Sequence, residues 1–283
     1  MQNRRAIKIF EAYDQSLSKV AISPPLPLSS PASAHRRIHA VYFCCHRDFT
    51  MLRMSLVSLL AHGGGKISRI YVYEDESDPL TGDEKRDLLS LTPLSIVSGP
   101  RYTGWGAEAL VRGLNFYRRM LADVPAGASA WLLKIDADLL FLNSHVFQQI
   151  ADCREDMFGQ PYTHPRGLTY SQGGCYAITT EFLHRLLATP VSEVMHTLSA
   201  KIGMPISHLP EDACVFSLAA RNGPRVKFSD FYLPAERIPT FVPSATEPAS
   251  AIHFETGGGK NLRLHMPRIA NCAASPSESR RAA

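Results

Sequence analysis

The chain has 283 residues, which is enough for one large domain or two small ones with a sizeable hydrophobic core. Hydrophobic residues make up 45% of the sequence and charged residues 20%, and this balance excludes a wholly disordered protein. The formal net charge of +4 suits an anionic small ligand but excludes a strongly basic nucleic-acid-binding protein, which needs a concentrated basic patch.

Both ends of the chain have the composition of poorly ordered segments. Residues 23–33 are rich in proline and serine, a composition typical of linkers. We therefore expect residues 1–37 to form a flexible N-terminal segment. Small and polar residues near the C-terminus predict a disordered tail over 271–283, so that one folded domain covers 38–270.

Between these ends, apolar runs typical of strands alternate with segments typical of helices. Strands are expected at 38–44, 69–73, 94–97 and 131–135, and helices at 51–62, 83–89 and 104–122. This order predicts an α/β fold with a doubly wound parallel sheet and helices on both faces. Ligands bind beyond the carboxyl ends of the strands in such sheets, so functional residues should directly follow strands.

Two aspartates, Asp136 and Asp138, close the fourth predicted strand, and apolar residues flank them on both sides. A buried carboxylate needs a cation or hydrogen-bond donors, and two carboxylates together suit Mg²⁺ or Mn²⁺. The alternative is that both are loop acids that cap the element beginning at Asn143. Lys134 shares their face of the strand, where the two acids, or a phosphate beside them, would satisfy its charge.

A strand that ends in Asp-x-Asp and leads into an apolar turn resembles the nucleotide-sugar glycosyltransferases of the GT-A fold, here over roughly 38–265. The segment Lys134-Ile-Asp-Ala-Asp138 is similar to that of the β-galactosyl and N-acetylglucosaminyl transferases, and also to that of glycogenin-like enzymes. The resemblance implies a Rossmann-like, mostly parallel sheet and a UDP-sugar donor. It also implies that Asp136 and Asp138 hold Mn²⁺ or Mg²⁺ on the donor diphosphate.

The same resemblance implies donor-binding residues after the first two strands. Arg47 follows the first strand, where it either reaches a phosphate or simply begins a helix. Asp75, with Glu74 as a close alternative, stands where the family has an acid that accepts a hydrogen bond from the uracil or ribose. A solvated acidic loop explains these two acids without any ligand. Lys134 completes the expected contacts to the donor phosphates.

Two motifs are expected on the acceptor side. Glu211 and Asp212 open a predicted helix, where acids also complement the helix dipole without any other role. In the inverting enzymes of the family the aspartate of such a pair is the base, so the resemblance implies Asp212 as catalytic base and Glu211 as an acceptor-binding residue. Gly173 and Gly174 resemble an acceptor-side segment, although a plain turn before a strand explains them equally well.

The last motif is His253, which is followed by a glycine loop and Lys260. Imidazole is a suitable third protein ligand for Mn²⁺, and the loop with Lys260 could fold over a diphosphate. This string resembles the His-Phe-x-Gly-x-x-Lys closing segment of glycogenin-like retaining transferases, with two extra residues before Lys260. It conflicts with the inverting Glu-Asp pattern, which has the better helix context.

The sequence therefore predicts a metal-dependent glycosyltransferase that moves a sugar from a UDP-sugar to a hydroxyl of a glycan or glycolipid, with inversion. A retaining glycogenin-like enzyme and a non-catalytic sugar-nucleotide-binding module are the alternatives, and no nucleic-acid partner is expected. No apolar run reaches the roughly 18 residues of a transmembrane helix. Six cysteines without a C-x-x-C pair favour a cytoplasmic location. Basic residues such as Arg4 and Arg5 leave a weak peripheral contact with the inner face of the membrane open.

Overall fold

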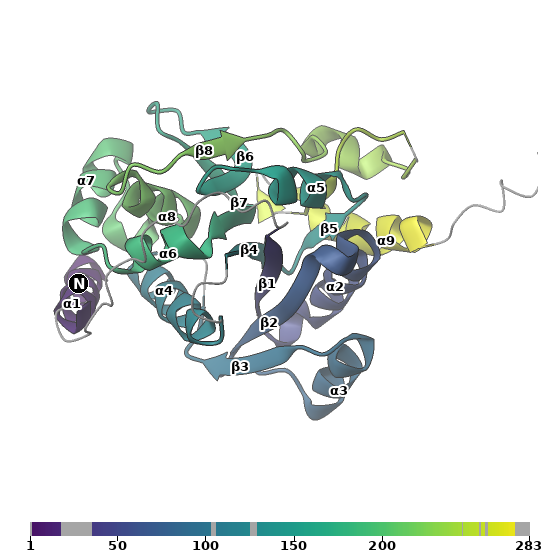
Figure 1. Ribbon diagram of the computed structural model, residues 1–283, viewed down its shortest axis with the longest axis horizontal. Coiled ribbons are helices and arrows are strands. Elements are labelled where there is room, and N and C mark those ends of the chain that lie inside the picture. Colours follow the sequence, from purple (N-terminus) through teal and green to yellow (C-terminus); the bar gives the residue numbers. More distant parts are fainter. Residues whose placement is uncertain are drawn as a thin grey trace, which may run out of the picture.

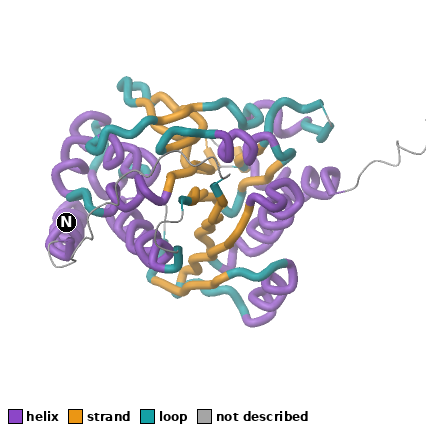
Figure 2. The backbone as a smooth tube through the Cα atoms, in the orientation of Figure 1, coloured by secondary structure: helices purple, strands orange, loops and turns teal. Residues whose placement is uncertain are grey.

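The computed structural model describes residues 2–17, 36–102, 106–124, 129–244, 246–254, 256–257 and 260–274. A seven-stranded sheet in the order β3-β2-β1-β4-β7-β6-β8 runs through the middle of the molecule. Figure 2 shows these strands passing between groups of helices. None of the described helices is long and apolar enough to cross a membrane.

One half of the sheet is parallel and contains the predicted strands. These are β1 (Arg37–Cys44), β2 (Ile67–Asp75), β3 (Ser95–Gly99) and β4 (Ala130–Asp136). The connecting helices are α2 (Phe49–Gly63), α3 (Gly82–Leu91) and α4 (Gly106–Ala122), with the short 3-10 segments η1 (His46–Asp48) and η2 (Gly64–Lys66) on either side of α2. The predicted α/β fold is confirmed, and the observed elements lie close to the predicted ranges.

The other half of the sheet is largely antiparallel. Strand β7 (Thr169–Thr179) pairs antiparallel with both β4 and β6 (Met157–Thr163), and β8 (Val226–Phe228) runs parallel to β6. The helices of this half are α5 (His145–Asp152), α6 (Thr180–Leu187), α7 (Ser192–Ile202) and α8 (Glu211–Ala220), and the 3-10 segment η3 (Ile206–His208) precedes α8. All pairings from β3 to β4 are parallel, and the antiparallel pairings are those of β7 with β4 and with β6. The sheet as a whole is therefore mostly parallel, as predicted.

Alternate residues of β1 belong to different hydrophobic clusters, one on each face of the sheet. Val41 and Phe43 pack in a cluster with residues of α4, α6, α7 and α8. Ala40 and Tyr42 belong to a second cluster, with residues of α2, α3 and α5. Burial on both faces explains why this strand reads as a continuous apolar run rather than as an alternating pattern.

A separate two-stranded antiparallel sheet joins the segment after the Asp-x-Asp motif to the C-terminal region. Strand β5 (Leu139–Phe141) pairs antiparallel with β9 (Ala251–His253). The surrounding segments are η4 (Ala235–Thr240), β10 (Thr256–Gly257), β11 (Lys260–Asn261), η5 (Leu262–His265) and α9 (Met266–Ala274). Residues of this region form a third hydrophobic cluster with Leu140 of β5.

The N-terminal segment differs from the expected flexible stretch over 1–37. Residues Gln2–Leu17 form helix α1, which lies beside α4 and α7 (Figure 1). Its buried face is Ala6, Phe10, Tyr13 and Leu17, which follow the spacing of a helical stripe. The Asp14 carboxylate also accepts hydrogen bonds from two backbone N–H groups at the start of α7. Residues 23–33, whose composition predicted a linker, lie outside the described residues.

The C-terminal boundary also differs from the expected one at 270. Helix α9 continues to Ala274, and its residues Met266 and Ile269 are buried in the third hydrophobic cluster. Apolar contacts at these two positions therefore order the start of the segment predicted as a tail. The remainder of that prediction, 275–283, lies outside the described residues.

Candidate functional site

The two aspartates singled out in the sequence stand at the carboxyl end of β4. Asp136 is the last residue of the strand and Asp138 precedes β5, with only Ala137 between them. The side chain of Asp138 is 5% exposed and that of Asp136 is 31% exposed. The buried apolar strand thus ends in one buried and one half-buried carboxylate, as expected at a ligand-binding edge of an α/β sheet.

His253 reaches these aspartates because β9 pairs with β5 and places it opposite Leu139. Its Nε2 lies 3.5 Å from Asp136 Oδ2 and 3.4 Å from Asp138 Oδ1. Burial alone would lower the pKa of His253, but hydrogen bonds to the two carboxylates outweigh burial and raise the pKa to about 10. The three residues predicted as metal ligands therefore converge, although His253 is more than a hundred positions away in sequence.

The second oxygen of each carboxylate pairs with a cationic side chain. Lys134 Nζ donates to Asp136 Oδ1 at 2.6 Å, and Arg263 donates through Nε and Nη2 to Asp138 Oδ2, both at 2.7 Å. Burial raises the pKa of Asp136, but the Lys134 charge and the hydrogen bond with His253 outweigh burial and hold the pKa below its ordinary value. Each aspartate consequently keeps one oxygen turned toward His253 Nε2.

This donor set fits a hard divalent cation. Asp136, Asp138 and His253 each offer a ligand atom, and these atoms all lie within 4.8 Å of one another. An octahedral Mg²⁺ holds its ligands at about 2.1 Å, which puts neighbouring ligand atoms about 3 Å apart. The distances of 3.4 and 3.5 Å from His253 Nε2 to the carboxylates are only slightly longer. Two oxygens and an imidazole nitrogen also suit Mn²⁺.

Glycines of β7 allow the close packing around this cluster. A Cβ atom at Gly174 would lie 2.7 Å from the His253 ring, closer than any side chain tolerates without movement. A Cβ at Gly173 would lie 3.0 Å from Asp212 Oδ2. The two glycines stand inside β7 rather than in a turn before a strand, so their role here is close approach rather than chain reversal.

Asp212 lies on the other side of Gly173, at the start of α8. Its Oδ1 accepts a hydrogen bond from Ala213 N at 2.8 Å. Burial first, and the neighbouring Glu211 carboxylate second, raise the pKa of Asp212 to about 7. An aspartate with such a pKa can take up a proton near neutral pH, which is the property required of a general base.

Glu211 lies in a different environment from the one expected for an acceptor-binding residue. Its side chain is 4% exposed, accepts a hydrogen bond from Tyr176 Oη at 2.7 Å and lies 4.0 Å from Lys134 Nζ. Burial raises its pKa. Because the interior of the protein surrounds its carboxyl group, Glu211 supports Lys134 and β7 rather than contacting an acceptor.

Lys134 is likewise enclosed by the protein. Besides Asp136, its Nζ donates to the Gly173 carbonyl at 2.5 Å, and the side chain is only 4% exposed. Burial lowers the pKa of Lys134, but the Asp136 and Glu211 carboxylates outweigh burial and raise it. Of the two partners considered from the sequence, the acids rather than a phosphate satisfy this lysine.

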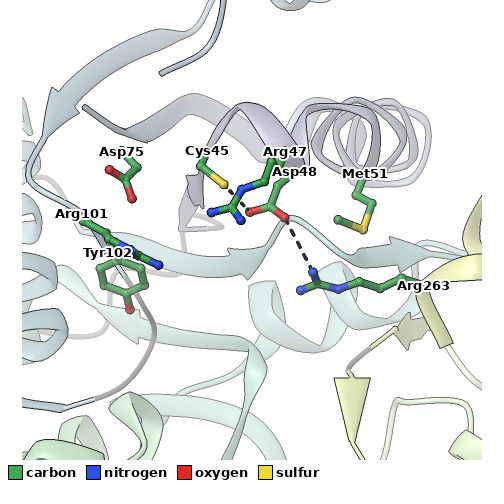
Figure 3. Close-up of a pocket in the computed structure, with 8 residues that line it drawn as sticks. All are labelled: Cys45, Arg47, Asp48, Met51, Asp75, Arg101, Tyr102 and Arg263. Carbon is green, nitrogen blue, oxygen red and sulfur yellow. Dashed lines mark hydrogen bonds and ion pairs between the residues drawn. The ribbon is translucent and has the colours of Figure 1, made fainter. Parts of the chain in front are cut away.

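A pocket of about 390 Å³ opens beside the cluster, beyond the carboxyl ends of β1, β2 and β3 (Figure 3). It is lined by Cys45, Arg47, Asp48, Met51, Asp75, Arg101, Tyr102 and Arg263. Both Arg47 and Asp75, the donor-binding residues predicted from the sequence, are among them. Glu74, the alternative to Asp75, instead turns inward and pairs with Lys85 Nζ at 2.7 Å.

The predicted residues of the pocket already have partners within the protein. Arg47 Nε lies 3.0 Å from Asp78 Oδ2 on the surface. Asp75 Oδ1 accepts hydrogen bonds from the backbone N and the Oγ of Ser77. Lys260, predicted to close over a diphosphate, belongs to β11, and its side chain lies outside the described part of the structure.

Six lining residues were not among the site residues predicted from the sequence, and three of them, Arg101, Tyr102 and Arg263, matter most for the chemistry of the pocket. Arg101 and Tyr102 follow β3, and the rule that functional residues follow strands would have selected them. Arg263 lies in η5, three residues beyond Lys260. Besides Asp138, its guanidinium contacts Asp48, with Nη1 3.7 Å from Oδ1 (Figure 3). No local pattern marks Arg263, because its importance depends on the pairing of β5 with β9.

Solved structures of glycosyltransferases share this architecture. The galactosyltransferase LgtC, solved in complex with donor and acceptor sugar analogues, superposes with a TM-score of 0.56 at 10% identity, and the match covers 86% of this chain and 99% of LgtC. Apo glycosyltransferase GlyE of Streptococcus pneumoniae TIGR4 matches at 0.50 and 10% identity, over 83% of this chain and 60% of GlyE. The bifunctional glycosyltransferase WbbM matches at 0.50 and 12% identity, over 89% and 52%.

Sequence comparisons add nothing to this picture, since no protein-family model and no curated protein matches the chain significantly. At identities of 10–12%, the structural likeness shows the fold alone. The chain has the GT-A fold that the Asp-x-Asp resemblance implied, and the cluster of Asp136, Asp138 and His253 lies at the carboxyl end of its central strand β4.

Proposed function

We propose that this protein is a metal-dependent glycosyltransferase that transfers a sugar from a UDP-sugar to a hydroxyl group of a glycan or glycolipid, with inversion. The observation that carries this proposal is the convergence of Asp136, Asp138 and His253 beside an arginine-lined pocket on a GT-A fold. A simple binding module has no need for three potential metal ligands next to a carboxylate whose pKa is raised to about 7.

Asp136 and Asp138 would hold the cation, Mn²⁺ or Mg²⁺, together with His253, whose Nε2 becomes a ligand when the cation displaces its proton. When bound, such an ion neutralises charge on a diphosphate leaving group. Lys134 fixes the orientation of Asp136 through its hydrogen bond, and Gly174 leaves room for the imidazole. These two residues therefore act on the ligands and not on the substrate.

The pocket beyond β1, β2 and β3 would hold the nucleotide and its phosphates. Arginine presents a planar fork of donors that matches phosphate oxygens, and Arg47, Arg101 and Arg263 all line this pocket. Asp75 would accept a hydrogen bond from the uracil or ribose. Lys260 remains a proposed phosphate contact from the resemblance of its segment.

Asp212 would take the proton of the acceptor hydroxyl as the new glycosidic bond forms. Its raised pKa and its place across Gly173 from the metal cluster support this role. Gly173 and Gly174 would serve this site by leaving room for the side chains of Asp212 and His253, which fill the space that a Cβ atom would take.

Retention is the second candidate, and one observation favours it: His253 lies in the cluster, and its segment resembles the closing segment of glycogenin-like retaining enzymes. NMR analysis of the product anomer, made from a donor of known configuration, decides between the two. An inverted anomer supports Asp212 as base, and a retained anomer assigns Asp212 another task.

The central test uses purified protein with a panel of nucleotide sugars, in MnCl₂ or in EDTA, with donor hydrolysis and transfer as readouts. We expect one donor to react, in the presence of metal only. Asp138→Ala should lower both rates at least about a hundredfold, because several kcal/mol of charge stabilisation are lost. Asp83→Ala on α3 removes an exposed aspartate that is outside the pocket lining and serves as the control. Unchanged rates in Asp138→Ala would contradict the proposed metal site.

A further inference from the structure

The charges of the two aspartates are already balanced within the protein. Asp136 pairs with Lys134 at 2.6 Å, and Asp138 pairs with Arg263 at 2.7 Å. Such pairing is required because a buried carboxylate without a counter-charge costs several kcal/mol. A divalent cation that enters this cluster meets two acids that are each neutralised. The free oxygen of each carboxylate can still contact the cation, but the cation would be held more tightly if one of the two ion pairs opened.

The two pairs differ in how easily they can open. Lys134 is 4% exposed, and its Nζ also donates to the Gly173 carbonyl and faces Glu211. Arg263 is 39% exposed and comes from the short 3-10 segment η5. Withdrawing Lys134 would leave several buried acceptors without a donor, whereas Arg263 lies next to the pocket and to solvent. Arg263 is thus the side chain that can move.

The position of Arg263 also supplies its second partner. It lines the same pocket as Arg47 and Arg101, and its guanidinium already reaches across to Asp48 at 3.7 Å (Figure 3). A diphosphate in this pocket would bring negative charges that an arginine fork can bind in place of the carboxylates. The side chain would then remain paired after it leaves Asp138.

We propose that Arg263 exchanges partners: it pairs with Asp138 and Asp48 as long as neither metal nor donor is bound, and it moves to the diphosphate when both bind. The proposal rests on the proposed function, since it assumes that the pocket takes a nucleoside diphosphate. It assigns Arg263 as a positioning residue that makes the binding of metal and of diphosphate interdependent. Metal alone should bind weakly, because it competes with the guanidinium, and diphosphate should strengthen metal binding by removing that competitor.

Calorimetry with Mn²⁺, in the absence and presence of inorganic pyrophosphate, tests this exchange without any turnover. For the native protein we expect pyrophosphate to tighten Mn²⁺ binding about tenfold or more, beyond the binding of Mn²⁺ by pyrophosphate itself. Arg263→Gln should bind Mn²⁺ alone about tenfold more tightly than the native protein, which corresponds to about 1.4 kcal/mol. The same variant should lose most of the strengthening by pyrophosphate.

Two further variants keep the test decisive. Arg263→Lys retains the charge and should stay close to the native affinity for Mn²⁺ alone. Arg237→Gln is the matched control, because Arg237 pairs with the buried Glu247 at 2.8 Å in the neighbouring segment η4, outside the pocket lining. It should lower stability and leave both Mn²⁺ affinities unchanged.

The outcomes separate the exchange from the proposed function. If Asp138→Asn abolishes Mn²⁺ binding while Arg263→Gln binds Mn²⁺ alone no more tightly than the native protein, the exchange is overturned and the metal site stands. If Asp138→Asn binds Mn²⁺ as the native protein does, or if no Mn²⁺ binds even with pyrophosphate, the metal site and the exchange both fail. A cooperative thermal unfolding transition of Arg263→Gln confirms that the variant is folded. We expect Mn²⁺ to raise the unfolding temperature of this variant more than it raises that of the native protein.

Discussion

The parallel and antiparallel halves of the sheet contribute to the site in different ways. The parallel half supplies Asp75 from the last position of β2, and Arg47 and Arg101 from the segments that follow β1 and β3. The antiparallel half supplies Gly173 and Gly174 from inside a strand, where bare backbone packs against functional side chains. The first half offers charges to a ligand, and the second half fixes the groups that meet it.

The candidate site forms where these two halves meet, at the end of β4. Strand β4 pairs with parallel β1 on one side and with antiparallel β7 on the other. The C-terminal region then adds His253 and Arg263 through the pairing of β9 with β5. The difference between the halves predicts that substitutions of the β7 glycines act through geometry, and that effects on transfer fade with distance from the end of β4.

The largest effect considered for this comparison is that of Asp212→Asn at the edge of the antiparallel half. Loss of a general base should lower transfer about 10²–10⁴-fold, while donor binding stays intact. In the native protein, transfer should rise with pH and level off above about 7, since the raised pKa of Asp212 keeps it protonated below that value. Initial rates and nucleotide titrations over pH 5.5–8.5, about the range that brackets this pKa, measure both quantities.

The same variant should be more stable than the native protein at pH 8. A carboxyl group whose folded pKa is raised favours the folded state only while it is protonated, so its cost appears as pH rises from about 4 through 7. Replacing it with a neutral amide removes that cost, about 2–4 kcal/mol for a shift of this size. Thermal unfolding at pH 5 and pH 8 should show a larger gain at pH 8. An equal loss at both values would mean that Asp212 is a structural residue.

A smaller effect is expected from Gly174→Ala, which changes geometry without touching a charge. The added Cβ would lie 2.7 Å from the His253 ring and must displace it from the two aspartates. Disturbing a metal ligand in this way typically costs 10–100-fold in metal affinity, and calorimetry with Mn²⁺ measures the loss. Gly167→Ala tests the opposite case, since no atom crowds that position although its positive φ adds strain. Native Mn²⁺ affinity in Gly174→Ala would show that His253 is no ligand.

The site residues that could be predicted are those with a local signal in the sequence, and those that depend on distant partners could not. Asp136 and Asp138 stand out locally, because two acids interrupt an apolar run at the point where a strand must end. Arg263 and the inward position of Glu211 depend on partners far along the chain, β9 in one case and Tyr176 of β7 in the other. Short-range patterns carry no information about such pairings. His253 was selected because a glycine loop and Lys260 follow it and because its segment resembles a known motif, and neither signal showed that it would meet the two aspartates.

The prediction of a flexible segment over 1–37 missed helix α1 for a different reason. Its stripe of Ala6, Phe10, Tyr13 and Leu17 has helical spacing and was readable in the sequence, but the proline-rich composition that follows dominated the interpretation of the whole segment. The partner of the stripe, formed by α4, α7 and η3, could not be known without the fold. A local pattern was therefore present without evidence of what would cover it.

The smallest effect on transfer is expected from Phe10→Ala in helix α1, which contributes no residue to the pocket lining. Phe10 is fully buried in the cluster that α1 shares with α4 and α7, so its truncation should cost about 3–5 kcal/mol of stability. Transfer by the folded protein should change less than about twofold, because α1 packs on the helices and supplies no residue to the pocket lining. Lys8→Ala, on the exposed face of the same helix, should change neither quantity. Denaturant unfolding and initial rates measured below the transition test this pair. A large loss of transfer in Phe10→Ala would show that α1, through η3 and the start of α8, helps to hold Asp212 in place.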